Sequence, residues 1–191
     1  MELQQALKVL AANRGDNVVV TTMAAIGEWF QLSNTPLDFA YMPSSMGQGP
    51  GLGLGIALAQ NRHGVVVVNG DGSMLMNLGS LVTLASHPAS LYLVIMDNQM
   101  YEITGGQPTV GAGKVDFAEL ARGAGIKRVY HFETLDDWRQ HAGEALSGPG
   151  PVVIWLRIAG RLGQQTPKPP RPMAEQLERL KGVLSTSNAS Q

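Results

Sequence analysis

Two short polar motifs follow two apolar segments of this chain, and they hold the side chains best suited to bind a metal ion. Four β-branched residues, 65–68, precede Asp71, and the apolar run 91–96 precedes Asn98. Runs of this kind are typical of strands buried on both faces of a parallel sheet. Because parallel strands end at the same edge, we expect Asp71 and Asn98 to lie close together. Carboxylate and amide oxygens are ligands that Mg²⁺ accepts.

The residues around Asp71 also suit an anion. Gly70 and Gly72 flank the acid in a tight turn whose backbone can approach a ligand closely. A helical pattern begins at Gly72 and Ser73, and a helix N-terminus favours an anion by about 0.3–1 kcal/mol. Acid, amide and turn together predict a Mg²⁺–diphosphate site. The alternative is a plain strand-to-helix turn in which Asp71 caps the helix.

Helical and strand patterns alternate on either side of these motifs. We predict helices at residues 2–13, 25–32, 51–61, 116–123 and 135–146, and further strands at 17–22, 38–41, 126–130 and 151–158. Such alternation is typical of an α/β protein with a doubly wound parallel sheet and helices on both faces. The polar motifs would then lie at the carboxyl edge of that sheet, where ligands bind.

The composition excludes several classes of protein. The chain has 191 residues, no cysteine, and a net charge of −1 from 14 basic and 15 acidic residues. We therefore expect no nucleic-acid partner, no disulfide and no thiolate chemistry. No apolar run approaches the roughly 20 residues that cross a bilayer, and residues 1–7 contain no signal-peptide core. These features favour a cytoplasmic protein that does not contact membranes.

The glycine-rich segment 44–55 resembles a nucleotide-binding loop but matches neither common phosphate motif. Its glycines fit no placement of Gly-x-Gly-x-x-Gly, and no Gly-Lys-Ser/Thr is present. A nucleotide-binding Rossmann protein is therefore disfavoured, and NAD binding would be its sign. Gly51, Gly53 and Gly55 begin the predicted helix 51–61. Alternate glycines let another helix pack very closely, which indicates an interface.

The spacing of residues 70–73 (Gly-Asp-Gly-Ser) and 97–98 (Asp-Asn) resembles the motif of thiamine diphosphate (ThDP) enzymes, a family of decarboxylases and carboligases. The resemblance implies the pyrophosphate-binding (PP) domain of that family over residues 1–160. It also implies that Asp71, Asn98 and the Met100 carbonyl bind Mg²⁺. Asp97 departs from the pattern, since many members have asparagine there. The implied contacts of ThDP in these motifs are Gly70, Gly72, Ser73, Asn98 and Met100.

Ser45-Met46-Gly47 resembles the Met-Gly segment of the same family, in which a bulky apolar residue lies between the two rings of the cofactor. The resemblance assigns Ser45, Met46 and Gly47 to the cofactor site, with a core methionine as the alternative for Met46. Gln48 stands where decarboxylases of sulfopyruvate and phosphonopyruvate commonly have histidine. Glutamine is no general acid at pH 7, so Gln48 is a candidate substrate contact only.

The string Thr-Gly-Gly-Gln-Pro-Thr at residues 104–109 resembles the corresponding loop of the sulfopyruvate and phosphonopyruvate decarboxylases. Gly105 and Gly106 would make this loop mobile, as a loop that closes over substrate must be. Tyr101 and Glu102 are candidate substrate contacts, and Tyr101 is also assigned to the cofactor. The alternatives are a packing tyrosine and a solvent-facing glutamate.

The resemblance implies a decarboxylase of small 2-oxo acids such as sulfopyruvate or phosphonopyruvate, in which the thiazolium acts as electron sink while CO₂ leaves. The alternatives are a carboligase subunit similar to acetolactate synthase and a non-catalytic regulatory subunit. In the family, a glutamate of a separate pyrimidine-binding (PYR) domain activates ThDP, and no segment here resembles that domain. We therefore expect a partner chain, in an α₂β₂ or larger hetero-oligomer.

The composition changes at residue 161. Residues 164–172 are rich in proline and predict an extended, polyproline-like arm. We predict a helix at 173–184 and disorder at 185–191. The segment 161–191 is expected to contact another subunit, and packing against its own domain is the alternative.

Overall fold

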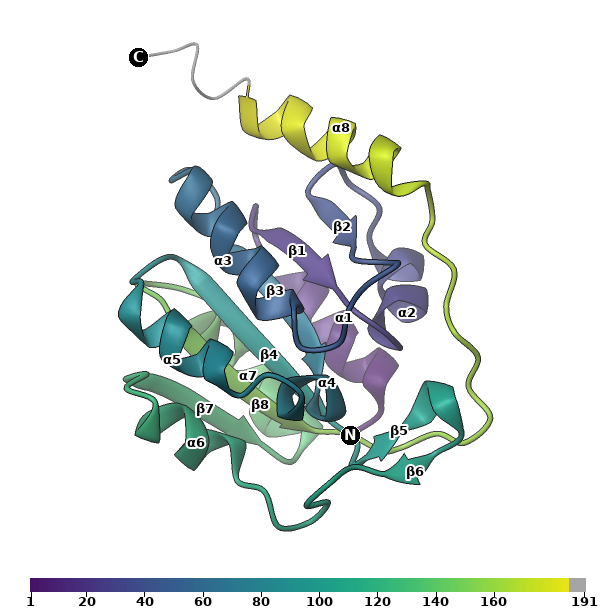
Figure 1. Cartoon of the computed structure of the whole chain (residues 1–191). Helices are drawn as coiled ribbons and strands as arrows, with labels where there is room; N and C mark the ends of the chain where they lie inside the picture. Colours follow the sequence, from purple (N-terminus) through teal and green to yellow (C-terminus); the bar gives the residue numbers. More distant parts are fainter. Residues whose placement is uncertain (186–191) are drawn as a thin grey trace.

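Six parallel strands make the central sheet of residues 1–185, the part of the chain that this computed structural model describes (Figure 1). The strand order is β2-β1-β3-β4-β8-β7. The strand bounds are β1 Val18–Thr21, β2 Asp38–Ala40, β3 Val65–Gly70, β4 Leu91–Asp97, β7 Arg128–Phe132 and β8 Val152–Arg157. A small antiparallel ladder pairs β5 (Met100–Tyr101) with β6 (Gln107–Pro108) beyond the end of β4.

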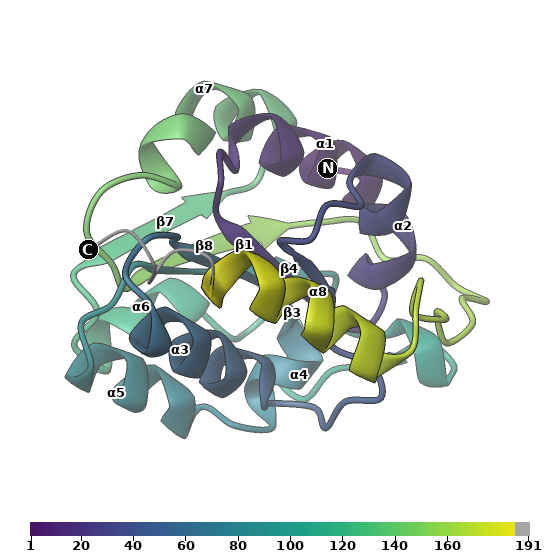
Figure 2. The ribbon, with the colours of Figure 1, turned by 90° about the horizontal axis from the view of Figure 1, so that it is seen from above.

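Helices cover both faces of the sheet (Figure 2). One face carries α1 (Leu3–Asn13), α2 (Ala25–Leu32) and α7 (Leu135–Ala145), and the other carries α3 (Gly49–Ala59), α5 (Gly79–Ser86) and α6 (Phe117–Gly123). Two short helices, α4 (Asp71–Leu75) and the 3-10 helix η1 (Glu102–Thr104), follow β3 and β5. This arrangement confirms the predicted doubly wound fold. Among residues 1–185, each helix is too short or too polar to cross a membrane.

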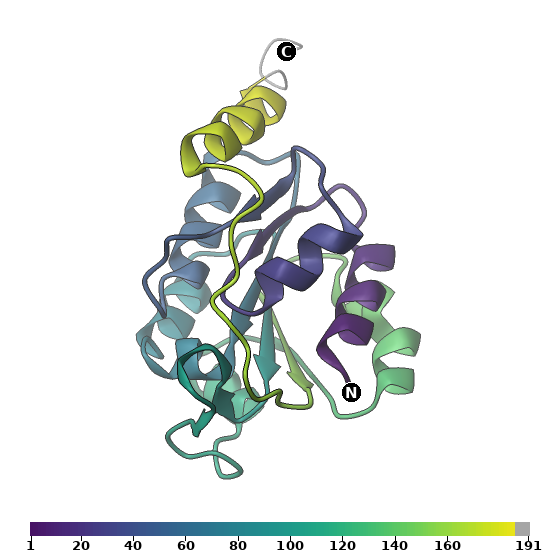
Figure 3. The same ribbon diagram turned by 90° about the vertical axis from the view of Figure 1, so that its right-hand side faces the viewer.

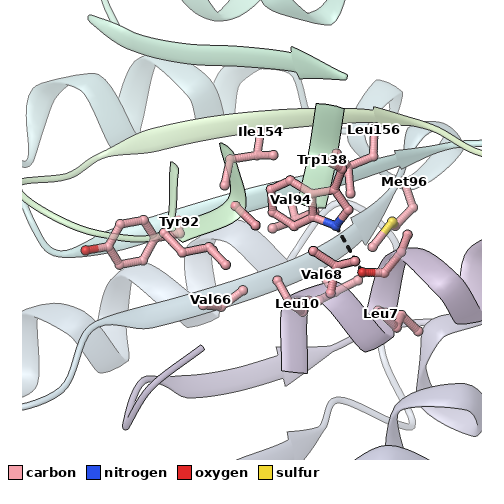
Figure 4. Packing of buried hydrophobic residues seen from close by; sticks show 14 of the residues in the cluster. Leu7, Leu10, Val66, Val68, Tyr92, Val94, Met96, Trp138, Ile154 and Leu156 are labelled. Carbon is pink, nitrogen blue, oxygen red and sulfur yellow. Dashed lines mark hydrogen bonds between the residues drawn. The ribbon is translucent and has the colours of Figure 1, made fainter. Parts of the chain in front are cut away.

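The central strands are apolar on both sides because each side faces a separate core. Val66 and Val68 pack with α1 and α7, whereas Val65 and Val67 pack with α3 and α5, and all four are fully buried. Trp138 of α7 fills the first core, and its Nε1 donates a hydrogen bond to the Ala6 carbonyl of α1 at 3.0 Å (Figure 4). The two cores therefore fix the position at which β3 ends.

The helix predicted after the Gly-Asp-Gly turn is divided in the structure into α4 and α5. Asn77 lies in the break, where its Nδ2 donates a hydrogen bond to the Gly47 carbonyl at 3.1 Å. Gly47 has φ +84°, and a Cβ there would lie 2.7 Å from the Asn77 Cβ. The break therefore positions the loop before α3, and that loop requires glycine at this point.

The arm that follows β8 runs along the domain and leads to α8 (Met173–Ser185) (Figure 3). This helix packs against β2 of its own chain: Ala40 N donates a hydrogen bond to Gln176 Oε1 at 2.7 Å, and Leu180 is buried. Contact of this segment with another subunit stays a prediction. Ser185, for which we predicted disorder, ends α8, and residues 186–191 lie outside the described residues.

Candidate active site

A cavity of about 380 Å³ opens at the carboxyl edge of the sheet, around the ends of β1 and β3. The strand order reverses at β1, because β2 lies on one side of it and β3 on the other. Ligands of doubly wound sheets bind at such a switch point. Segments after β1, β3 and β4 supply most of the walls, and the polar lining includes Thr22, Ser44, Asn69, Asp71, Ser73, Asn98 and Thr104.

Asp71 begins α4 directly after Gly70, and both residues line this cavity. The Asp71 side chain is buried, and Thr109 Oγ1 donates a hydrogen bond to its Oδ2 at 3.0 Å. Burial, with the nearby Asp97 carboxylate as the second cause, raises the pKa of Asp71 to about 6. A bound divalent cation would offset both effects, because it compensates the buried negative charge. Asp71 therefore has the chemistry expected of a metal ligand.

Asn98 follows β4 and lines the same cavity. Its Oδ1 accepts a hydrogen bond from Met100 N at 3.0 Å, which closes a tight turn. Gln99, between them, has φ +63°, a left-handed conformation that few residues other than glycine adopt. The Gln99 side-chain oxygen accepts hydrogen bonds from Arg157 in the amide orientation that satisfies both groups. The turn keeps Asn98 and Met100 on the cavity wall that includes Asp71.

Asp97, which departs from the family pattern, contacts the neighbouring strand. Its Oδ2 accepts a hydrogen bond from Trp155 Nε1 at 2.9 Å and lies 3.1 Å from Arg157 Nη1. The Asp97 side chain is buried but is not part of the wall of the cavity. It therefore fixes the end of β4 against β8, one residue before Asn98.

The residues of the wall fit a Mg²⁺ ion. Proteins usually supply one or two carboxylates to Mg²⁺, and phosphate and water oxygens complete its octahedral shell. Asp71 and Asn98 offer one carboxylate and one amide on the same wall. Within residues 1–185, no three His, Cys, Asp or Glu side chains converge in a way that would hold a metal. A metal here would therefore depend on the Asp71 carboxylate, on neutral protein oxygens and on a bound phosphate.

Gly72 and Ser73 lie in the first turn of α4, where backbone N–H groups have no carbonyl partner within the helix. A Cβ on Gly72 would collide with the Tyr101 ring, so glycine is required for Tyr101 to pack here. The Ser73 hydroxyl donates to Asn69 Oδ1 and accepts from Gly47 N, both at 2.9 Å. Because this hydroxyl already holds the loop at Gly47, the backbone N–H of Ser73 is the group that remains for an anion.

The loop before α3 contains four predicted contacts, and one of them reaches the cavity. Met46 lines the cavity, is half-buried, and belongs to neither hydrophobic core, so it is not a core methionine. Ser45 and Gln48 are exposed, and Gly47 is buried. None of these three is part of the cavity wall that residues 1–185 form. Their contact with a cofactor or substrate stays a prediction.

Tyr101 and Glu102 both line the cavity. Glu102 is 5% exposed, so the alternative of a solvent-facing glutamate is wrong. Its Oε1 accepts a hydrogen bond from Arg161 N at 2.7 Å, and the Arg161 guanidinium forms an ion pair with Glu28 at 2.7 Å. Glu102 is therefore tied to the beginning of the arm and to α2.

The sequence analysis missed, as individual residues, two threonines of the cavity wall and a third that binds Asp71. Thr109 entered only as the end of a loop string, yet its hydroxyl binds Asp71. Thr22 follows β1, lines the cavity, and donates a hydrogen bond to the Val68 carbonyl at 3.0 Å. A polar residue at the end of β1 was a usable signal, because β1 ends at the same edge. Thr166 reaches the cavity from the arm, and no sequence pattern indicates that return.

The family model of the thiamine pyrophosphate enzyme, C-terminal TPP binding domain, matches residues 19–156. The phosphonopyruvate decarboxylase of Streptomyces viridochromogenes is 36% identical over 173 residues, which cover 90% of this chain and 43% of that protein. Sulfopyruvate decarboxylase subunit beta of Methanothermobacter thermautotrophicus is 37% identical over 160 residues, which cover 83% of this chain and 82% of that subunit. The chain spans less than half the length of the phosphonopyruvate decarboxylases of Streptomyces viridochromogenes and Streptomyces hygroscopicus.

Solved structures with a similar fold include two decarboxylases. The thiamine diphosphate-dependent 4-hydroxybenzoylformate decarboxylase of Rhodococcus jostii RHA1 has a TM-score of 0.67 at 18% identity, over 85% of this chain and 33% of that one. Benzoylformate decarboxylase from Polynucleobacter necessarius has a TM-score of 0.67 at 23% identity, over 87% of this chain and 34% of that one. These likenesses support the fold. Because the family model covers most of the sheet and both polar motifs, the chain belongs to the thiamine pyrophosphate enzymes, as their C-terminal TPP-binding domain.

Proposed function

We propose that this chain is the ThDP- and Mg²⁺-binding subunit of a 2-oxo acid decarboxylase. The observation that carries the proposal is that Asp71 and Asn98 line one cavity at the switch point of the sheet. Their oxygens suit Mg²⁺, and the first turn of α4 suits the diphosphate that this metal would bind. Membership of the thiamine pyrophosphate enzymes supports ThDP as the cofactor.

When bound, ThDP supplies the electron sink that lets a 2-oxo acid lose CO₂. Asp71, Asn98 and the Met100 carbonyl would hold the metal, and the hydrogen bond from Thr109 orients the Asp71 carboxylate. The apolar part of the wall excludes water, which strengthens each electrostatic contact inside the cavity. Met46 would support the cofactor rings. The other apolar residues of the wall include Leu3, Met23, Met42, Met96, Ile103 and Ile158.

Sulfopyruvate and phosphonopyruvate are the substrate class that we infer. Relatives named phosphonopyruvate decarboxylase and sulfopyruvate decarboxylase subunit beta are 34–42% identical to this chain. The loop string at residues 104–109, which resembles theirs, folds beside the cavity, where Ile103 and Thr104 are part of the wall. These observations support a small anionic 2-oxo acid.

A partner chain would complete this active site. The acidic side chains on the wall are Asp71 and Glu102, and residues 1–185 place no lysine, arginine or histidine there. An anionic substrate needs cationic or hydrogen-bond donors, and ThDP needs the glutamate of a PYR domain. The name of the sulfopyruvate decarboxylase relatives, subunit beta, supports a second subunit. We propose an α₂β₂ or larger assembly.

Helix α3 is a candidate surface for that assembly. Gly51 and Gly55 are exposed, and a Cβ on either would meet nothing within 4 Å. The backbone of another subunit can therefore approach this face of α3 closely. Gly53, in contrast, faces the sheet, where a Cβ would collide with Val67.

Two other functions stay as alternatives. The large subunit of acetolactate synthase isozyme 1 from Escherichia coli is 25% identical over 173 residues, so a carboligase has weaker support. A non-catalytic subunit would bind ThDP without turnover in the complete assembly. The departures at Gln48 and Asp97 raised this alternative, and the contacts of Asp97 with Trp155 and Arg157 now give that residue a structural explanation.

The experiment measures cofactor binding and turnover separately. Calorimetry on the chain mixed with a PYR-domain partner follows ThDP binding with Mg²⁺ and with chelator, and CO₂ release follows a panel of 2-oxo acids. We expect binding that needs Mg²⁺ and turnover that needs both chains. Asp71→Ala should weaken ThDP binding by at least about 10-fold, by analogy with other metal-site losses. The matched control, Asp136→Ala, changes an exposed aspartate of α7.

Each outcome addresses one part of the proposal. Equal ThDP affinity with metal and with chelator would exclude the metal site. Robust turnover by this chain alone would exclude the need for a partner. Carboligation without release of an aldehyde would favour the carboligase, and ThDP binding with no reaction would favour the non-catalytic subunit.

A further inference from the structure

The beginning of the arm packs against the loop that follows Asn98. We call residues 160–167 the strap and residues 98–106 the substrate loop. A Cβ on Gly160 would lie 2.5 Å from Met100 Cε and 3.2 Å from the Asn98 carbonyl oxygen. A Cβ on Gly106 would collide with Leu162. The two segments are therefore in close contact, although more than fifty residues separate them in the chain.

One cation of the strap lies between two carboxylates of different elements. Arg161 Nη1 lies 2.7 Å from Glu28 Oε1 of α2, and Arg161 Nε lies 3.8 Å from Glu102 Oε1 of η1. The backbone N–H of Arg161 donates to the same Glu102 oxygen at 2.7 Å. The side chains of Glu102, Glu28 and Arg161 are 3%, 19% and 27% exposed. This cluster therefore joins α2, the strap and the substrate loop.

Burial makes this cluster energetically important. Glu102 is buried on the cavity wall, and its Oε2 has no hydrogen-bond partner within residues 1–185. Removing the partner of a buried charge leaves that charge uncompensated and destabilises the surrounding structure strongly. Arg161 is the cation paired with Glu102, so the substrate loop depends on the strap for its charge balance.

The strap continues across the side of the cavity. Thr166 is part of the cavity wall, and Pro167 lies against α2, where its Cβ is 3.8 Å from the position of a Cβ on Gly27. In Figure 3 the arm passes between the region of β5 and α2 before it reaches α8. The strap therefore closes one side of the site with residues that come after the sheet is complete.

We propose that Arg161 is a positioning residue that fixes the substrate loop through Glu102 and braces it against α2 through Glu28. That Arg161 keeps the substrate loop ordered follows from these contacts alone, whereas the effect of Arg161 on catalysis rests on the proposed function. The conformation at Asn98 depends on the same strap, because Gly160 packs against Met100 and against the Asn98 carbonyl.

Hydrogen exchange of the full chain, read by mass spectrometry, tests the order of the loop. The variants are Arg161→Gln and Glu102→Gln, each of which removes one charge from the cluster. Hydrogen bonds to charged groups stabilise local structure. Because each variant weakens such a bond, we expect about tenfold faster exchange in peptides covering residues 98–109. The matched control is Arg171→Gln, on the same arm, where the guanidinium binds Glu175 at 3.0 Å and Asn34 at 2.6 Å.

The control should accelerate exchange around α8 and leave the substrate loop unchanged. Unchanged loop exchange in Arg161→Gln and Glu102→Gln, or equal acceleration by Arg171→Gln, would overturn the proposal. Circular dichroism verifies that each variant folds. If Arg161→Gln does not fold, Glu28→Gln, which keeps a hydrogen-bond acceptor, replaces it in the exchange experiment.

The complete enzyme gives a second, independent readout. If the proposed function holds, Arg161→Gln should raise KM for the 2-oxo acid more than it lowers kcat, because the loop is less ordered before substrate binds. Arg161→Lys keeps the charge but cannot serve two carboxylates with one planar group, so it should restore loop protection only in part. If the complete parent enzyme releases no CO₂ but Arg161→Gln still loses its loop protection, the positioning role of Arg161 is retained and the proposed function is rejected.

Discussion

Asp71 combines burial with a neighbouring carboxylate, and both disfavour its charged form. Its pKa is raised from 3.8 to about 6. A group whose pKa is raised in the folded state contributes stability that is present below the unfolded pKa and is lost as the pH rises through the folded pKa. In the absence of metal, the charged Asp71 therefore opposes folding at neutral pH.

The first prediction concerns this charge. Asp71→Asn removes it with little change in shape, so in chelator at pH 7 the variant should be the more stable protein. The difference corresponds to about two pKa units, or up to about 3 kcal/mol in the free energy of unfolding. Urea denaturation between pH 4 and pH 7 measures the difference, which should disappear toward pH 4.

In the same experiment with Mg²⁺ and ThDP, the parent chain should be more stable than Asp71→Asn, because a ligand that binds the folded state stabilises the parent chain. A parent chain that is more stable than Asp71→Asn at pH 7 in chelator would contradict the prediction. A variant advantage that persists unchanged at pH 4 would show that the gain has a cause other than charge.

Single residues also mark what the sequence could reveal about the site. Asp71 and Asn98 were predictable because each follows an apolar strand directly, and parallel strands end at one edge. Two other features were not predictable from the sequence: the hydrogen bond from Thr109 to Asp71, and the contacts of Asp97 with Trp155 and Arg157. These partners come from a loop and from β8, whose side-chain positions depend on packing that no local pattern encodes.

The packing of α1, α2 and β2 against one another depends on one buried carboxylate. Asp38 Oδ1 accepts hydrogen bonds from Arg14 Nη1 at 2.5 Å and Trp29 Nε1 at 3.0 Å. Its Oδ2 accepts from the Ser33 hydroxyl and from Thr35 N, both at 2.6 Å. The carboxylate thus orients α2, whose preceding turn includes Met23 and Ala24 of the cavity wall.

The second prediction follows from that packing. Asp38→Ala leaves Arg14 buried without its carboxylate, and such a loss destabilises a protein by about 3–5 kcal/mol. Chemical denaturation should show a large decrease in the midpoint. Asp136→Ala, which breaks an exposed pair with Arg139, is the control and should change the midpoint little. Similar effects of the two substitutions would contradict the role of Asp38.

Elements were predictable where the periodicity was strong. The β-branched runs of β1 and β3 and the alternation of strands with helices gave the doubly wound fold. The break between α4 and α5 was not predictable, because residues 75–79 continue a helical pattern and the hydrogen bond from Asn77 to Gly47 is a tertiary contact. The β7 strand begins at Arg128 instead of residue 126, where Ile126 packs at the end of α6 instead of within the sheet.

The course of the arm over the domain could not be deduced from the sequence. A polyproline-like segment has no internal hydrogen bonds, so its sequence specifies an extended form but not a direction. The structure brings Arg161 to Glu102 of the cavity wall, Thr166 to the wall itself, and Arg171 to Asn34. A segment expected to leave the domain therefore forms part of the wall of its candidate active site.

The contact between α8 and β2 has a further consequence, for self-association. β2 is an edge strand, and edge strands with unpaired N–H groups are templates on which other chains add strands. Gln176 occupies the Ala40 N–H with a side-chain oxygen, and Leu180 is buried nearby in α8. We therefore expect this helix, which covers the edge, to protect the sheet from amyloid-like growth.

The third prediction is that a chain ending at Pro172 aggregates under conditions in which the full chain stays clear. Light scattering during incubation at increasing concentration measures this, and a dye that binds cross-β fibres identifies the product. Gln176→Ala keeps the helix but removes the acceptor for Ala40 N, so it should aggregate at an intermediate rate. A truncated chain that scatters no more light than the full chain would show that β2 needs no cover, and that α8 protects no edge from fibre growth.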